Sequence, residues 1–193
     1  RPLRLAERPP RTIYGCRSQI RLKGRPEIVT PECESHANMV TWEFPGLGDL
    51  PPLAVHWYDG GMRPMRPEGL DPRTPMPDAG LLFVGAKGTM LSGFAGGRDL
   101  LLPEERFRGF QRPARTLPRT IGHYLEWTRG CKTGAATSCP MDFGSELTEM
   151  ALLGTLAIRT GRLLQWDASA RQITNDPEAD RLVDPPYRAG WSI

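Results

Sequence analysis

The string HWYDGG at residues 56–61 holds the residues whose types and spacing best suit polar chemistry. Asp59 follows an aromatic pair and precedes two glycines, where an extended segment has to turn. A carboxylate in this place can accept a proton or a hydrogen bond from a ligand hydroxyl. The same residues also fit an Asx-turn, in which the aspartate accepts backbone N–H groups. From the residues alone, Asp59 is therefore either a ligand-binding residue or a turn residue.

His123 is a second candidate, since it follows Gly122 near the beginning of a predicted helix. Imidazole can donate or accept a proton at neutral pH. The alternative is a surface or packing histidine in the first helical turn. A thiol–imidazole pair of Cys131 or Cys139 with His123 also stays open. No G-x-S-x-G elbow is present, and neither GAKG nor GFAGG matches a phosphate-binding loop.

The residues that could ligate a metal are poorly arranged. Glu32 and His36 lie four residues apart, but Pro31 and the non-helical pattern around them argue against one shared helix face. The four cysteines show no CxxC spacing. We therefore predict no metal site, and we expect reduced, mostly buried thiols in a cytoplasmic protein.

The net charge of +3 is unevenly distributed along the chain. Residues 1–26 carry eight lysines and arginines against one acid, whereas the remainder carries 17 basic and 21 acidic side chains. A basic arm on an acidic body can attract nucleic acid or an anionic surface. Tyr14, however, is the only aromatic residue of the arm that could stack on bases. No apolar run approaches the roughly 20 residues of a membrane span, so we expect neither nucleic acid nor a membrane as a partner.

Hydrophobic periodicity predicts the elements that position these residues. In chain order they are strands at 38–44 and 53–58, a hairpin at 80–93, helices within 118–134 and 144–161, and a strand pair at 162–167 and 171–174. Alternation places His56 and Tyr58 on the strand face opposite Trp57. Gly161 is placed to end the second helix. Asn175, three residues before Glu178, resembles the cap of a further short helix.

Strands and helices are segregated along the chain rather than alternating. This order predicts an α+β fold with a largely antiparallel open sheet and helices packed on one face. Residues 1–36 lack sustained periodicity and are predicted to form an irregular basic leader, so the folded domain is expected at residues 37–193. The other face of the sheet, with His56 and Tyr58, mixes polar and apolar side chains, as is typical of a face that meets a partner.

Seven strings in register carry a resemblance to a known family. They are WEFP, HWYDGGMRPMRPEGL, GLLFVGAKGTML, LPRTIGHYLEWTRGCKTG, SELTEMALLGTLAIRTGRLLQWD, TNDPEAD and YRAGW. Their order and spacing from Trp42 to Trp191 resemble the C-terminal domain of bacterial Gfo/Idh/MocA oxidoreductases. That family includes glucose–fructose oxidoreductase and inositol dehydrogenase.

This resemblance implies a two-domain enzyme. In the family, an N-terminal Rossmann domain binds NAD(P), and the C-terminal domain closes over a sugar-like or polyol substrate and commonly forms the subunit interface through its sheet. A Glu-Lys-Pro lysine and an Asp-x-x-x-His pair assist proton transfer there. This chain shows neither a Rossmann fingerprint nor Glu-Lys-Pro, and its nearest match to the pair is ECESH at residues 32–36. No catalytic residue of the family therefore carries over.

The resemblance predicts that the chain is the substrate-binding and oligomerisation domain of a sugar or polyol oxidoreductase, and that its Rossmann domain is missing from this sequence. We expect Asp59 and His123 to be polar substrate contacts, and His56 and Tyr58 to face a partner subunit of a homo-oligomer; the catalytic residues stay unknown. NAD(P) belongs to the full-length enzyme, so we expect this chain alone to bind no cofactor and to be inactive. The alternative is a non-catalytic dimerising or carbohydrate-binding remnant of the family.

Overall fold

The structure, a computed structural model, describes residues 3–18, 35–94, 96–97 and 99–191. The chain forms two compact units, Arg1–Met62 together with Thr120–Ile193, and Arg63–Arg119. Both units contain an antiparallel sheet, and the first also carries the α-helices, so the predicted α+β fold is confirmed. In the part of the chain that is described, no helix combines the length and the apolar character needed to cross a membrane.

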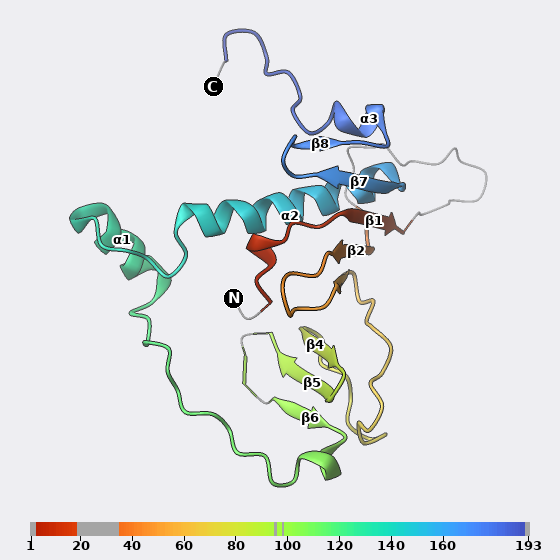
Figure 1. Ribbon diagram of the computed structural model, residues 1–193, viewed down its shortest axis with the longest axis vertical. Helices are drawn as coiled ribbons and strands as arrows, with labels where there is room; N and C mark the ends of the chain where they lie inside the picture. The colour runs from red at the N-terminus through yellow and green to blue at the C-terminus, as the bar shows by residue number, and fades with distance from the viewer. Residues whose placement is uncertain (1–2, 19–34, 95, 98, 192–193) are drawn as a thin grey trace. The chain divides into compact units, whose positions relative to one another are not determined.

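Five antiparallel strands build the open sheet of the first unit, in the order β3-β2-β1-β7-β8 (Figure 1). They are β1 (Thr12–Arg17), β2 (Asn38–Phe44), β3 (Leu53–Tyr58), β7 (Leu163–Asp167) and β8 (Gln172–Ile173). The strands predicted at 38–44 and 53–58 are confirmed with the same bounds. The strand pair predicted at 162–167 and 171–174 is confirmed to within one residue at each end.

β1 is the central strand of this sheet, and it corrects the expectation of an irregular leader over residues 1–36. Ile13 pairs with Trp42 of β2 on one side and with Leu164 of β7 on the other. Upstream of it, Leu5–Glu7 forms a 3-10 turn, η1. The prediction failed because TIYGCR is short, and its glycine hides the alternation that marks a strand. Residues 19–34 of the predicted leader lie outside the described residues.

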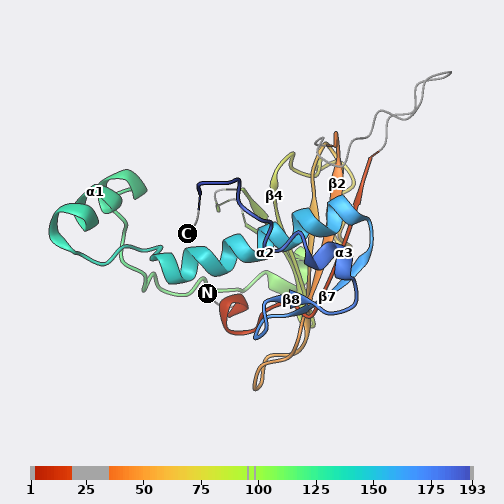
Figure 2. The same ribbon diagram turned by 90° about the horizontal axis from the view of Figure 1, so that it is seen from above.

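α2 (Met141–Thr160) covers one face of the sheet and lies beside β1 and β2 in both ribbon views (Figure 1, Figure 2). The core between them consists of Ile13, Val40, Trp42, Phe44, Leu153, Ala157, Leu164, Trp166, Ile173 and Ala179. Gly15 of β1 permits the close approach, because a Cβ there would lie 2.5 Å from the backbone nitrogen of Ile158. The helix ends at Gly161 in the left-handed conformation, as predicted.

Two further helices surround α2 in sequence, α1 (His123–Thr133) before it and α3 (Pro177–Asp180) after the β7–β8 pair. α1 has no buried residue. Asp176 is the N-cap of α3, and its side chain accepts backbone N–H groups of the first turn. The cap predicted at Asn175 is therefore wrong by one residue. Asn175 instead accepts a hydrogen bond from the backbone nitrogen of Gln165 at 2.8 Å, because its side chain points back toward β7.

The second unit is built on a three-stranded antiparallel sheet in the order β4-β5-β6. Its elements are β4 (Gly80–Gly85), β5 (Gly88–Gly93), β6 (Leu100–Leu102) and the 3-10 turn η2 (Glu104–Phe107). The pair β4–β5 is the hairpin predicted from residues 80–93. Leu70, Leu91 and Leu102 form the small buried core of this unit.

Candidate functional site

Asp59 lies directly after β3, and its carboxylate ties the end of that strand to the beginning of β2. Oδ1 accepts hydrogen bonds from the backbone nitrogen of Asn38 at 2.6 Å and from Asn38 Nδ2 at 3.1 Å. Oδ2 accepts from Asn38 Nδ2 at 3.2 Å and from Trp57 Nε1 at 3.0 Å. The backbone nitrogen of Asp59 also donates to Asn38 O at 3.1 Å. Asp59 therefore holds β3 against β2.

These contacts occupy the acceptor positions of the Asp59 carboxylate. Two carboxylate oxygens offer about four lone-pair sites, and the contacts from Asn38 and Trp57 number four. A substrate hydroxyl would have to displace one of them to donate to Asp59. The backbone oxygen of Asp59 accepts from Met62 N at 3.1 Å and closes the glycine turn. Asp59 is thus part of the turn through its backbone oxygen, but its carboxylate accepts from Asn38 and Trp57 and not from the turn N–H groups of an Asx-turn. The substrate contact of Asp59 stays a prediction.

His123 begins α1, and its side chain is exposed. The imidazole ring lies 4.1 Å from the ring of Tyr124, centroid to centroid, at an interplanar angle of 41°. No side-chain hydrogen bond caps this end of α1, which follows Gly122. The imidazole is accessible to a ligand, and its substrate contact also stays a prediction. Among the described residues, no hydrogen bond joins His123 to Asp59, so direct contact does not bring the two together.

Glu126, one turn further along α1, is a candidate site residue that sequence reasoning does not identify. Its carboxylate accepts hydrogen bonds from Thr120 Oγ1 at 2.5 Å, from Ser138 Oγ at 2.6 Å and from Ser138 N at 3.0 Å. These bonds, those from the Ser138 and Thr120 hydroxyls first, lower the pKa of Glu126 to about 2, and the charge of His123 adds a smaller effect in the same direction. The partners lie 6 and 12 positions away in sequence, outside the helical spacing that a pattern search uses.

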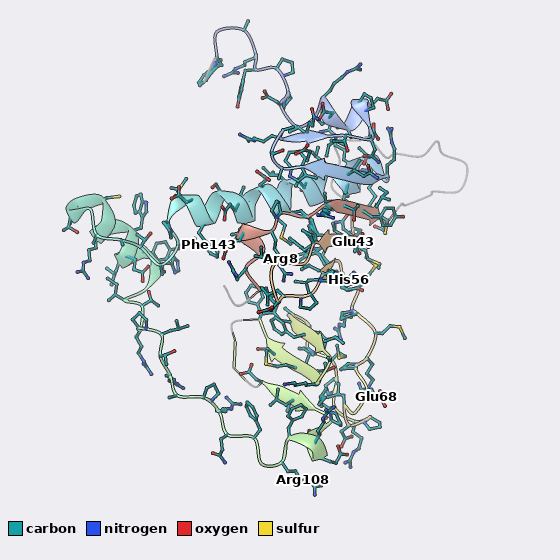
Figure 3. All side chains as sticks on the ribbon, viewed as in Figure 1. Arg8, Glu43, His56, Glu68, Arg108 and Phe143 are labelled. Atoms are coloured by element: carbon teal, nitrogen blue, oxygen red, sulfur yellow. The ribbon has the colours of Figure 1, made fainter. Side chains whose placement is uncertain are left out.

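The sheet face opposite α2 carries His56 and Tyr58, the predicted interface residues. Thr41 pairs with His56 on one side and with Tyr14 on the other, so these three side chains point to the same face. His56 Nδ1 lies 2.9 Å from Thr41 Oγ1. Figure 3 shows His56 with Glu43 of the neighbouring strand among the side chains of this sheet. The register thus extends the predicted surface from β3 across β2 to β1.

Large apolar side chains share this open face with the polar ones. Tyr14, Met39 and Leu163 lie on it with 46%, 38% and 53% of their surface exposed. Exposed apolar groups among polar neighbours are typical of a surface that meets a partner. Sequence reasoning does not identify Tyr14, because β1 is not expected. The sequence signal that could have indicated β1 is an alternation: Ile13 and Gly15 face α2, whereas Tyr14 between them faces away.

No metal centre is assembled among the residues that the structure describes. Within residues 3–18, 35–94, 96–97 and 99–191, no three His, Cys, Asp or Glu side chains form a group that could hold a metal ion. Glu32 of the ECESH string lies outside the described residues. Cys16, Cys131 and Cys139 are free thiols. The expectation of mostly buried thiols is wrong for Cys131 and Cys139, which are exposed because α1 and the loop after it contribute nothing to the core.

Two cavities are lined by residues other than the predicted ones. In the first unit, a cavity of about 190 Å³ is lined by Leu5, Phe44 and Met150 among others, and by none of the four predicted site residues. In the second unit, a groove of about 1440 Å³ is lined by equal numbers of arginines and carboxylates. Arg108, labelled in Figure 3, is one of these arginines. The arginines and carboxylates are Arg73, Arg108, Arg112, Arg115, Asp71, Asp99, Glu104 and Glu105. The groove therefore has no charge excess that would select an anion.

Fold and site together define an α+β domain whose open antiparallel sheet is covered by a helix on one face and exposed on the other. Residues 111–193 match the family model of the oxidoreductase family, C-terminal alpha/beta domain, of the Gfo/Idh/MocA type. The predicted resemblance is confirmed over this part of the chain, from α1 to α3, which is similar to the C-terminal domain of the Gfo/Idh/MocA oxidoreductases. No curated protein and no solved structure matches the chain.

Proposed function

We propose that this chain is the substrate-binding and oligomerisation domain of an NAD(P)-dependent sugar or polyol oxidoreductase. The family match over residues 111–193 carries the proposal, because it assigns α1 and α2 to the C-terminal domain of oxidoreductases. The exposed face of the sheet supports it, since a ligand or a second subunit has room there. In this proposal a Rossmann domain outside the given sequence holds NAD(P), and this chain alone binds no nicotinamide. The exposed free thiols of Cys131 and Cys139 favour a cytoplasmic location.

Within this proposal, the chain binds and orients the substrate hydroxyl groups. Hydride exchange with a carbinol carbon is the chemistry that a bound nicotinamide supplies. The exposed imidazole of His123 donates to or accepts from one substrate hydroxyl. Asp59 fixes the end of β3, and it becomes a direct contact where a hydroxyl replaces one of its present donors. The residue that moves the hydroxyl proton has no assignment within this chain.

One observation favours a second function, a non-catalytic dimerising or carbohydrate-binding domain. Asp59 is the carboxylate that the sequence offers as a candidate site residue, and Asn38 and Trp57 fill its acceptor positions. A carboxylate in that state serves the fold rather than proton transfer. The two functions differ in what precedes Arg1 in the complete polypeptide. A strand–turn–helix with G-x-G-x-x-G and a Glu-Lys-Pro string there supports the enzyme, whereas a start codon directly before Arg1 refutes it.

The catalytic proposal is tested in the polypeptide that the complete gene encodes. We expect His123→Ala to lower kcat/KM for the sugar or polyol substrate about tenfold or more and to leave the affinity for the nicotinamide unchanged, as removal of a substrate contact requires. Lys132→Ala, on the opposite end of α1, is the matched control. An unchanged kcat/KM in His123→Ala removes His123 from the substrate site. For the isolated chain, micromolar NADH affinity in a fluorescence titration would overturn the assignment of the cofactor to another domain.

The oligomerisation role is tested on the open face of the sheet. Tyr14→Glu and Leu163→Glu place a charge at two exposed apolar positions of that face. Burying an unpaired carboxylate in an interface is strongly unfavourable, so we expect both variants to shift the sedimentation velocity toward the monomer. Met141→Glu, at an exposed position of α2, is the control and should leave the assembly unchanged. A wild-type chain that is monomeric at high micromolar concentration contradicts the oligomerisation role.

A further inference from the structure

α1 is held in place by something other than apolar packing. None of its residues is buried, and Tyr124, Leu125 and Trp127 expose 77%, 62% and 70% of their surface. An 11-residue helix is marginal in water without tertiary support. Local hydrogen bonds must therefore contribute much of the stability of α1, and they also fix the position of His123, the first residue of this helix.

The hydrogen bonds that do this converge on Glu126. Thr120, just before the helix, donates from Oγ1 to Glu126 Oε1, and the same Oγ1 accepts from the backbone nitrogen of Gly122 at 3.0 Å. Ser138, in the loop that returns from the far end of α1, donates to Oε2 through both its hydroxyl and its backbone nitrogen. The backbone N–H of Gly122, the residue before His123, is thus joined through Thr120 to Glu126, and through Glu126 to the returning loop.

We propose that Glu126 is a positioning residue that holds His123 in the orientation needed for substrate contact, by clamping the entry to α1 and the loop that leaves it. This inference rests on the proposed function, because it takes His123 as the residue that meets the substrate. Glu126 itself touches no substrate. It acts through Thr120 and Gly122 on one side and through Ser138 on the other.

The clamp needs an acceptor that serves donors on both sides, and a carboxylate is the side chain that does so. An ionised carboxylate only accepts, with capacity on both oxygens, whereas the NH₂ group of a glutamine can only donate. Ser138 N can only donate, so Oε2 must remain an acceptor. The lowered pKa of Glu126, about 2, keeps the carboxylate ionised at neutral and mildly acidic pH. His123 is the one charged neighbour that contributes to this shift.

The first test measures the clamp itself in the whole chain by hydrogen exchange. Glu126→Ala removes all three acceptor contacts, and loss of one hydrogen bond to a charged group changes an opening equilibrium by on the order of tenfold. We expect amide exchange at Gly122 and at Ser138, the two amides that the clamp holds, to accelerate at least about tenfold. Glu146→Ala, a carboxylate on an exposed position of α2, is the matched control and should leave these amides unchanged. Unchanged exchange in Glu126→Ala overturns the inference.

Two milder variants separate positioning from general unfolding. Thr120→Val keeps the shape of the side chain and removes only the contact before the helix. Glu126→Gln keeps an acceptor for Ser138 and should restore protection of the Ser138 amide more than protection of the Gly122 amide. Should Glu126→Ala unfold the chain, Thr120→Val decides the matter. Accelerated exchange at Gly122 alone supports the clamp, and none at all refutes it.

The second test follows His123 during ligand addition. The chain has three histidines, so the ¹H–¹³C imidazole signal of His123 can be identified with His123→Gln. myo-Inositol and D-glucose serve as the probes. We expect the wild-type signal to shift on titration and Glu126→Ala to raise the apparent Kd at least about fivefold, with Glu126→Gln between them. An equal Kd in Glu126→Ala overturns the positioning role and leaves the proposed function intact. A wild-type imidazole signal that does not shift with either probe removes His123 from the substrate site. In that case only the hydrogen-exchange test decides whether Glu126 forms the clamp.

Discussion

The contact of Trp42 with Gly154 gives the sharpest prediction of this structure. Trp42 of β2 lies buried against α2, and its Nε1 donates to the backbone oxygen of Met150 at 2.9 Å. Gly154 lies one turn further along the helix, and a Cβ there would stand 2.4 Å from Trp42 Cζ2. In an isolated helix, replacing a glycine by alanine stabilises. Here we predict the opposite sign for Gly154→Ala.

The magnitude follows from three contributions. Restoring an ordinary contact of 3.4 Å or more requires the ring or the helix to move by about 1 Å. Overpacking of this kind costs about 1–3 kcal/mol, and a displaced indole loses its bond to Met150, a further loss of about 0.5–1.5 kcal/mol. The higher helix propensity of alanine offsets about 1 kcal/mol. We therefore expect the free energy of unfolding to fall by about 1–3 kcal/mol.

Urea unfolding followed by circular dichroism measures this difference, and the same helix supplies the control. A Cβ at Gly144 would meet only Cys139 Sγ, at 3.7 Å, which is an ordinary contact. Gly144→Ala should therefore raise stability by up to about 1 kcal/mol. The variant Trp42→Phe should make Gly154→Ala less harmful than it is in the wild-type background, because a smaller ring leaves room. A Gly154→Ala chain at least as stable as the wild type would refute the packing of Trp42 on α2.

Four further predictions test the elements around the candidate site. Asp59→Ala leaves the Asn38 donors at the β2–β3 junction without their acceptor, so the free energy of unfolding should fall by about 1–3 kcal/mol in urea titrations; an unchanged midpoint would deny Asp59 its structural role. The guanidinium of Arg8, 3% exposed, donates to the backbone oxygens of Leu3, Pro45 and Pro51, so Arg8→Met should cost about 1–3 kcal/mol by the same measurement, with Arg8→Lys between it and the wild type. Because the pKa of Glu126 is lowered from 4.5 to about 2, its bonds stabilise α1 above pH 4.5 and are lost as the pH falls toward 2; α1 amide exchange, corrected for intrinsic rates, should rise over that interval in the wild type and stay flat in Glu126→Gln. Deletion of residues 1–36 removes the central strand β1 and should abolish the cooperative unfolding transition.

Strong local periodicity explains which parts of the fold can be predicted from the sequence. Val40, Trp42 and Phe44 alternate with polar residues because one face of β2 is buried against α2, so burial leaves a period of two in the sequence. α2 is found for the same reason, and Gly161 marks its end by adopting the left-handed conformation that glycine favours. In these elements local preference and tertiary packing agree, which is the condition for a reliable prediction.

The elements that escape prediction depend on contacts distant in sequence. In β1, Gly15 is buried together with Ile13, and its lack of a side chain is explained only by the backbone of α2, more than a hundred residues later. α1 shows the converse case. Its helical pattern predicts an apolar stripe through Ile121 and Leu125, yet neither is buried. Periodicity reports that a helix can present an apolar face, and it does not report whether anything covers that face.

The candidate site also contains one residue that local sequence identifies and one that it does not. Asp59 is recognisable as a turn residue because an acid before two glycines is a local signal. The bonds that its carboxylate accepts from Asn38, 21 residues earlier on β2, are not local and cannot be predicted from that signal. Glu126 is not recognisable, because its partners Thr120 and Ser138 meet it only once α1 has formed and the loop has returned. A glutamate in a helix is otherwise typical of an exposed, solvated position.

The position of β1 also determines how the proposed interface can be studied. Its residues alternate between two roles, since Ile13 and Gly15 face α2 while Tyr14 faces away from it. The family match begins at residue 111, so β7 lies within it, whereas β1, β2 and β3 do not. A substitution at Ile13 would disturb core and interface together and could not separate them. Tyr14→Glu changes only the open face, and it does so on a strand outside the matched segment. A loss of assembly in Tyr14→Glu, with the same unfolding midpoint as wild-type protein diluted to the monomer, would therefore show that the interface extends beyond the part of the chain that the family model matches.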